Sequence, residues 1–237
     1  MGEQMQLFSI TGDDTVLCDT SLCYAAVERL SAHSPVTART SSVAEVVLCV
    51  LEGELRVDAV EGAGEESRSA LGEMEGVQIP AGWDWRGETG SAGCKVLRVE
   101  SFHPHFNPEQ ALMPALARPH PFAVADDQML VYTDYIRGGV LNFRPGFVAD
   151  KHFHQDADEL FWFFQGHCRV GTPEGVVVAP AGTIIYTAPG EWHIIENAGP
   201  EPLLMFVAVT PNIVPSHTFF DADGNPLVRS WEPLRGR

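Results

Sequence analysis

Apolar residues recur along this chain in short runs of about five to eight positions, separated by Gly, Pro and Asp. Runs of this kind, rich in Val, Ile and aromatic residues and closed by turn formers, are typical of β-strands. Helical periodicity is weak except in residues 21–30 (SLCYAAVERL) and 108–119 (PEQALMPALARP), and the prolines of the second segment allow only a short helical turn. The pattern predicts an all-β sandwich or barrel, with strands in residues 43–53, 94–101, 159–166 and 203–212.

The two halves of the chain carry similar patterns. Aligning Gly53 with Gly166 places VVLCVLEGELRV on ELFWFFQGHCRV, and aligning Trp85 with His193 places IPAGWDW on TAPGEWH. Repetition of this kind indicates two copies of one structural unit. We therefore predict a first barrel over residues 1–105, a proline-containing linker over 106–127 and a second barrel over 128–237.

Four residues of the second half have the chemistry and spacing of metal ligands. Alternate side chains of a strand share a face, so His152 and His154 point the same way, with Phe153 opposite. Glu159 begins the next strand after the turn-like QDAD, and His193 follows the Pro-Gly turn of TAPGEWHIIEN. Three imidazoles and one carboxylate favour Fe(II), Mn, Co, Ni, Cu or Zn over Ca or Mg, which prefer oxygen ligands.

The spacing of these residues resembles the two signature motifs of the cupin superfamily. Between Gly146 and Gly166 stand five residues, His-x-His, four residues, Glu and six residues, as in the first motif. The second motif is matched from Gly182 to Asn197, except that Ala188 stands where the signature has proline. The resemblance implies a jelly-roll barrel with one metal ion held by His152, His154, Glu159 and His193. With the internal repeat, the chain resembles a bicupin, that is, two tandem cupin barrels.

Strand alternation also predicts the surroundings of the metal. If Glu159 faces the barrel interior, Phe161 and Phe163 do so too, whereas Leu160, Trp162 and Phe164 face the other sheet or the partner domain. Ile195 points inward together with His193. These side chains predict an apolar, aromatic pocket suited to a small organic substrate, although core packing is an equal interpretation of each Phe. Further candidates for substrate contact, on flanking strands of unknown facing, are Tyr135, Arg144 and Tyr186.

Three functions are compatible with this site. The resemblance favours an oxygenase, because many cupins are dioxygenases and an Fe(II) centre with open coordination positions can activate dioxygen. A non-redox isomerase, cyclase, lyase or decarboxylase, in which the metal polarises a carbonyl group, would use the same ligands. A non-catalytic bicupin that binds a small ligand is the third alternative, although open coordination positions argue against a structural metal.

The first half is predicted to bind no metal. Opposite the ligand positions of the second half, the alignment places Arg39, Ser41, Val46 and Trp85, which offer no ligand set. Glu45 lies one residue from the Glu159 position, and a one-residue shift turns a side chain to the opposite face. One metal ion per chain is therefore expected. The first half would cover an apolar sheet of the second barrel or form a homodimer contact.

Three other polar groups receive structural interpretations. His103-Pro104-His105, with Glu109 after it, is interpreted as linker because its prolines prevent strand pairing. Asp156 and Asp158 either accept hydrogen bonds from ligand imidazoles or form a polar turn, and we favour the turn. The tail around His217 either covers a barrel mouth or forms a surface hairpin with an Asp-Gly turn, and we favour the hairpin.

Composition and charge limit the classes of molecule that the chain is expected to bind. A formal net charge of -17 argues against nucleic acids and anionic membranes, which repel an acidic surface, and leaves small molecules or proteins as partners. A homodimer is expected. No apolar run reaches transmembrane length, and the start MGEQMQLFSITGDD lacks the features of a signal peptide, so a cytoplasmic location is expected. Five cysteines without a C-x-x-C pair suit reduced, buried thiols.

Overall fold

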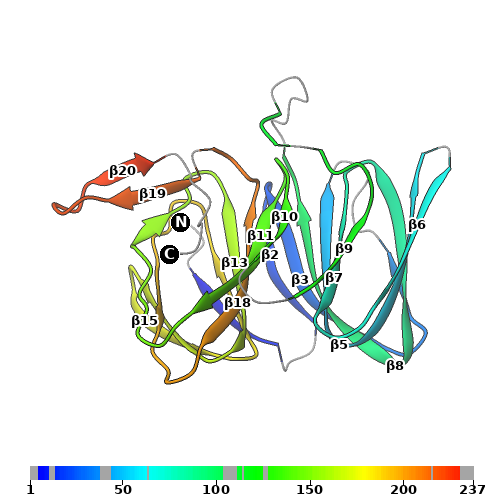
Figure 1. The fold of residues 1–237 in the computed structure, drawn as a ribbon, viewed down its shortest axis with the longest axis horizontal. Coiled ribbons are helices and arrows are strands. Elements are labelled where there is room, and N and C mark those ends of the chain that lie inside the picture. Colours follow the sequence, from blue (N-terminus) through cyan, green and yellow to red (C-terminus); the bar gives the residue numbers. More distant parts are fainter. Residues whose placement is uncertain are drawn as a thin grey trace.

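The fold of this chain is all-β, as the sequence predicts, and consists of two barrels that lie side by side (Figure 1). The computed structural model describes residues 5–10, 14–37, 44–62, 64–103, 111–113, 115–124, 128–214 and 216–229. Each named element in this part of the chain is a β-strand. None of the described residues belongs to a helix long and apolar enough to cross a membrane.

The first barrel is built on one large sheet in the order β2-β3-β8-β5-β7-β9, with β4 added to β8 and β6 added to β5. Its two longest strands, β5 and β8, pair antiparallel along most of their length. The strands are β2 (Thr15–Asp19), β3 (Cys23–Leu30), β4 (Pro35–Thr37), β5 (Glu45–Glu61), β6 (Glu65–Leu71), β7 (Glu75–Ile79), β8 (Trp83–Ser101) and β9 (His120–Ala123).

The second barrel combines three sheets, in the orders β1-β16-β13-β18-β11-β10, β15-β14-β17 and β12-β19-β20. The last of these is a hairpin, β19–β20, that adds to the short strand β12 at the left of Figure 1. The strands are β1 (Gln6–Ser9), β10 (Gln128–Tyr132), β11 (Arg137–Phe143), β12 (His152–Phe153), β13 (Asp158–Gln165), β14 (His167–Thr172), β15 (Gly175–Pro180), β16 (Thr183–Thr187), β17 (Ile194–Asn197), β18 (Leu203–Thr210), β19 (His217–Phe220) and β20 (Pro226–Arg229).

Three segments differ from their predicted roles. Strand β1 lies within the predicted first domain but pairs with β16 of the second barrel. Strand β9 lies within the predicted linker but pairs with β7 of the first barrel, so the first barrel extends beyond its predicted limit. The predicted start of the second barrel, residue 128, coincides with the start of β10. Residues 21–30, which have helical periodicity, contain strand β3 instead of a helix. Ala25 and Val27 of this strand are buried in an apolar cluster between the barrels, and this packing overrides local propensity.

Alternation along β13 divides its side chains between two cores, as predicted. Phe161 and Phe163 belong to the core of the second barrel. Leu160 and Trp162 point the other way, into an apolar cluster shared with first-barrel residues such as Val47. The first barrel therefore covers an apolar sheet of the second.

Two glycines support the internal repeat. Gly53 and Gly166 both have a positive φ, 83° and 87°, which disfavours any side chain. Each also lies against the backbone of a neighbouring strand, since an added Cβ would meet the Gly93 carbonyl oxygen in one barrel and the Pro202 carbonyl oxygen, at 2.7 Å, in the other. The two glycines thus have the same role at corresponding positions of the two barrels.

Replacing Gly166 by alanine is expected to destabilise the protein by more than about 2 kcal/mol, because left-handed strain and a backbone clash add together. Gly146→Ala is the matched control, since Gly146 also has a positive φ, 76°, but has nothing within 4 Å of an added Cβ. Urea unfolding of both variants should show the larger loss for Gly166→Ala. Equal losses would contradict the close approach of the two strands.

Candidate metal centre

Two of the predicted ligands are brought together by backbone pairing. His152 in β12 and His193, just before β17, form an isolated antiparallel bridge with hydrogen bonds in both directions, at 3.2 and 2.9 Å. Their imidazole centroids are 4.4 Å apart. His154 lies two residues beyond His152, and its ring centroid is 5.5 Å from that of His152.

The carboxylate of Glu159 completes this group. One of its oxygens, Oε2, lies 3.2 Å from Nε2 of His154 and 3.0 Å from Nε2 of His193. All three side chains are buried, with relative exposures of 2% for His154, 3% for Glu159 and 1% for His193. The structure thus gathers the four predicted ligands in one place in the second barrel.

Backbone carbonyl groups fix the proton positions on the three imidazoles. Nδ1 of His152 lies 2.8 Å from the Asp150 carbonyl oxygen, and Nδ1 of His193 lies 3.4 Å from that of Glu191. Nδ1 of His154 contacts the carbonyl oxygen of Ser216. A carbonyl oxygen only accepts hydrogen bonds, so each Nδ1 carries the proton and each neutral ring keeps a lone pair on Nε2.

This arrangement fits a metal ion. Nε2 of His154, Nε2 of His193 and Oε2 of Glu159 are buried without a hydrogen-bond partner, although they face one another. Three buried acceptors with no proton between them are costly unless a cation lies among them. The donor set, three imidazole nitrogens and one carboxylate oxygen, suits a divalent transition metal.

Burial and neighbouring charges control protonation here. Burial, reinforced by His193, lowers the pKa of His152 to about 3, so its ring is neutral and able to act as a ligand. Burial alone would raise the pKa of Glu159, but positive charge on the adjacent His154 and His193 rings lowers it well below its usual value, and a metal ion held between these side chains would act in the same direction. A neutral His152 and an ionised Glu159 are the forms that bind metals.

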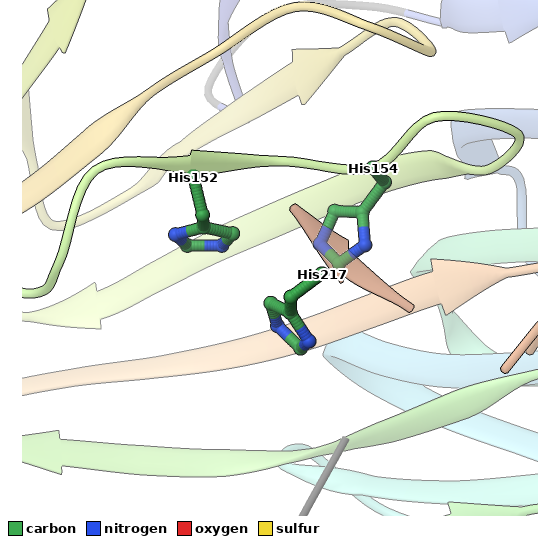
Figure 2. A group of neighbouring side chains, drawn as sticks. All are labelled: His152, His154 and His217. Atoms are coloured by element: carbon green, nitrogen blue, oxygen red, sulfur yellow. The ribbon is translucent and has the colours of Figure 1, made fainter. Parts of the chain in front are cut away.

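A fourth histidine lies at the site. His217 begins β19, and the pairing of β19 with β12 sets Phe219 opposite His152. The imidazole of His217 lies 4.9 Å from that of His152 and 4.6 Å from that of His154, between ring centroids (Figure 2). Potential ligand atoms therefore form two overlapping groups, His152 with Glu159 and His193, and His152 with His154 and His217.

The predicted hairpin with an Asp-Gly turn is confirmed at β19–β20, where Gly224 has a positive φ of 84°. What the sequence prediction missed is that His217, at the start of this hairpin, faces the metal site. Burial, together with the neighbouring His154 and Arg137, lowers the pKa of His217 to about 2. The only sequence signal was a histidine two residues before Phe219, which puts both on one face of a strand.

Arg137 was also missed. It lies opposite Val209 in β18, which in turn lies opposite Glu159, so the two charged residues share one face of the sheet. The side chain is only 6% exposed, and its Nη1 donates a 2.7 Å hydrogen bond to Oγ of Ser216. Burial lowers the pKa of Arg137 to about 10, although Glu159 opposes this, and the group remains charged at neutral pH.

The predicted pocket residues of the inward faces lie at different depths. Phe161 borders the site, with its ring edge-on to His193 at a centroid distance of 5.4 Å. Phe163 stacks on Phe161 and lies further along β13, away from Glu159. Ile195 belongs to the same apolar cluster. Phe163 and Ile195 thus serve as core beneath the site.

The other three candidates lie elsewhere. Tyr186 points into the cluster between the barrels, where its hydroxyl donates to Asp158 at 2.7 Å. Arg144 is exposed and follows the end of β11 that is remote from Arg137. Tyr135 is in the loop between β10 and β11, and its ring contacts His103 edge-on at 6.1 Å. Their facing depends on strand register and loop path, which sequence alternation alone does not give.

Asp158 is the first residue of β13 and not a turn residue. It is fully buried and accepts hydrogen bonds from Thr20 of the first barrel, at 2.8 Å, and from Tyr186. Asp156 is exposed, in keeping with the predicted turn. Of the second His-x-His, only His103 lies within the described residues, and Pro104, His105 and Glu109 lie outside them.

The corresponding place in the first barrel is apolar. Val46 and Trp85 are buried in the apolar core of that barrel, and Arg39 and Ser41 lie outside the described residues. Glu45 points to the opposite face, as predicted, and accepts a hydrogen bond from Thr133 of the second half. Among the described residues, both groups of potential metal ligands lie in the second barrel. That the first half binds no metal stays a prediction.

Comparison with known proteins supports this description of the second barrel. Residues 139–209, which include all four predicted ligands, match the family profile described as the cupin domain. The fold is the cupin jelly roll. No curated protein sequence matches the chain.

Solved cupin structures resemble the chain across most of its length. A variant of the oxalate decarboxylase of Bacillus subtilis has a TM-score of 0.61 at 13% identity, over 90% of this chain and 78% of that one. The oxalate decarboxylase of Lactobacillus farciminis, solved as a formate complex, has a TM-score of 0.59 at 16% identity, over 90% and 88%. A further Bacillus subtilis structure, from a study of its Mn(II) centres, has a TM-score of 0.61 at 13% identity, over 90% and 78%. At such low identities the likeness concerns the fold alone.

Proposed function

We propose that this chain is a mononuclear metal-dependent cupin enzyme whose metal is held by His152, His154, Glu159 and His193. The observation that supports this most strongly is the buried group of Nε2 of His154, Nε2 of His193 and Oε2 of Glu159, which lack hydrogen-bond partners and face one another. We propose Fe(II) as the native ion, with Mn(II) as the main alternative. The ion would supply Lewis acidity for a substrate oxygen and, as Fe(II), activation of dioxygen.

The charges around the site favour a substrate that carries an acidic oxygen. Glu159 contributes one negative charge and Arg137 one positive charge, and both side chains are buried. Because these two charges balance, the charge of a divalent ion would remain to be compensated by the substrate. Phe161 and Phe219 lie against the ligand imidazoles and supply an apolar border. A small organic acid with an apolar or aromatic body fits both features.

Two reaction classes remain as proposals. The aromatic side chains around the imidazoles favour an oxygenase, since an apolar site protects reactive species from water. The charge balance and the fold shared with oxalate decarboxylases favour a non-redox lyase that removes carbon dioxide from its substrate. We propose the oxygenase first and the decarboxylase second. They differ in one property that is simple to measure, the need for dioxygen.

Elemental analysis of the purified chain, followed by activity assays with Fe(II), Mn(II) and Zn(II), tests this proposal. We expect about one ion per chain, and consumption of dioxygen by the Fe(II)-loaded protein with a member of a panel of small aromatic and aliphatic carboxylic acids. Full turnover without dioxygen, or with Zn(II), would replace the oxygenase by the lyase. Failure of the chain to bind any of these ions would refute the metal-enzyme proposal.

A further inference from the structure

His217 has two possible roles at the site. Its ring lies against those of His152 and His154, so it could serve as a further metal ligand. Alternatively, it could donate a hydrogen bond to whatever binds beside the metal. The two roles require opposite proton positions, because a ligand nitrogen needs a free lone pair and a donor nitrogen needs a proton.

The hydrogen bonds of Ser216 decide between them. A guanidinium group only donates hydrogen bonds, so Oγ of Ser216 accepts the 2.7 Å bond from Arg137. The same oxygen lies 2.8 Å from Nδ1 of His217. If Nδ1 donated this second bond, the buried hydroxyl hydrogen of Ser216 would lose its acceptor, which is costly. The hydroxyl group therefore donates to Nδ1 of His217.

A neutral imidazole that accepts at Nδ1 carries its proton on Nε2. His217 thus has the opposite tautomer to the three predicted ligands, whose Nδ1 atoms donate to the carbonyl groups of Asp150, Ser216 and Glu191. The four histidines divide into three with a lone pair on Nε2 and one with a proton there.

The position of His217 is fixed at the open side of the site. His152 and His217 are half-buried, so the site is accessible from the side of β12 and β19. The remaining three side chains of the site, those of His154, Glu159 and His193, are almost fully buried. The hairpin is held there by the pairing of β12 with β19 and by Phe220, whose ring packs on Phe153 at 5.7 Å and lies 4.4 Å from Nζ of Lys151.

From these contacts we infer that His217 is a hydrogen-bond donor, not a metal ligand: its Nε2–H binds an acidic oxygen of the substrate at the open side of the metal site. Arg137 and Ser216 are positioning residues that act through it by fixing its tautomer. This inference rests on the proposed function, since it assigns a substrate contact to the same site. It also explains how a buried arginine, which contacts Ser216, influences the site.

Three variants test this role. In His217→Gln the amide N–H can replace Nε2–H, whereas His217→Phe keeps a ring without a hydrogen-bond donor. Ser216→Ala removes the hydroxyl group that fixes the tautomer of His217. Exposed His167→Phe, on β14 of the same barrel, is the matched control. We expect all four to bind as much Co(II) as the wild type. Titration of the Co(II)-loaded proteins with acetate, followed by visible absorption, should show about tenfold weaker binding for His217→Phe, the value of one hydrogen bond to a charged group. We expect His217→Gln to retain most of the affinity and Ser216→Ala to fall between the two.

A separate readout reports the tautomer directly. Nitrogen-15 NMR of histidine-labelled protein, with Zn(II) and without metal, should show Nε2 of His217 protonated in both states. Loss of Co(II) binding in His217→Phe, or an unprotonated Nε2, would show that His217 is a ligand and overturn the inference. Unchanged acetate affinity in His217→Phe would also overturn it. If the wild type bound no metal, the proposed function would fail, and the spectrum of the metal-free protein would still decide the tautomer.

Discussion

Replacing His154 by alanine is expected to leave the barrel folded but to weaken metal binding by more than about 100-fold, because residues that merely orient a ligand already contribute about 10- to 100-fold. The variant lacks Nε2 of His154, which lies 3.2 Å from Oε2 of Glu159 and is one of the proposed metal-binding atoms. Elemental analysis and competition with a chelator measure the loss. Glu159→Gln should be milder, since the amide keeps an oxygen donor but loses the charge that balances the cation.

His167→Ala is the matched control for this experiment, because His167 is exposed on β14 of the same barrel. It should keep its metal, and circular dichroism should show that both variants are folded. Unchanged metal content in His154→Ala would mean that the ligand assignment is wrong. Equal loss in both variants would instead indicate a general effect of removing histidines.

Much of this site could be predicted because strand alternation is strict. A period of two residues fixes which side chains of β13 share a face, so Glu159, Phe161 and Phe163 could be separated from Leu160 and Trp162 without knowledge of the fold. The spacing of the ligands added the jelly-roll topology through its resemblance to cupins. Both predictions depend on residues that are close together in the sequence or belong to a repeated motif.

Arg137 and His217 could not be predicted in the same way. Arg137 reaches the site through two strand pairings, β11 with β18 and β18 with β13, and His217 through the pairing of β19 with β12. Strand order and register depend on contacts between distant segments, and a shift of one residue would turn either side chain away. The same holds for β1, which crosses to the second barrel because its partner β16 offers an edge.

The first barrel also influences the position of a ligand. Asp158 immediately precedes Glu159, and its two carboxylate oxygens accept hydrogen bonds from Thr20 of β2–β3 and from Tyr186 of β16. The start of β13 is therefore tied to both barrels. Because a ligand's geometry depends on the backbone that carries it, the first half contributes to the site without supplying a ligand of its own among the described residues.

A second buried carboxylate joins the barrels at Glu45. Its Oε1 accepts hydrogen bonds from Nε2 of Gln78, at 2.6 Å, and from Oγ1 of Thr133, at 2.7 Å, and the side chain is 2% exposed. Burial, together with the nearby Asp134, raises the pKa of Glu45 to about 7 despite these two donors. Below about pH 7 the neutral form is thus preferred in the folded protein, whereas the unfolded chain ionises this residue at its ordinary pKa of 4.5.

Glu45→Gln is therefore expected to stabilise the metal-free protein in a pH-dependent manner. A pKa raised from 4.5 to about 7 gives the wild type a stability that is complete below the lower value and is lost as the pH rises through the higher one. Glutamine keeps an oxygen for both donors and never ionises, so the variant should match the wild type near about pH 4 and exceed it by about 3 kcal/mol above about pH 8. Urea unfolding across this range measures the difference, with exposed Glu54→Gln on the same strand as the control for net charge. A difference between Glu45→Gln and the wild type that does not change with pH would show that Glu45 has the same pKa in the folded and the unfolded protein, contrary to its burial.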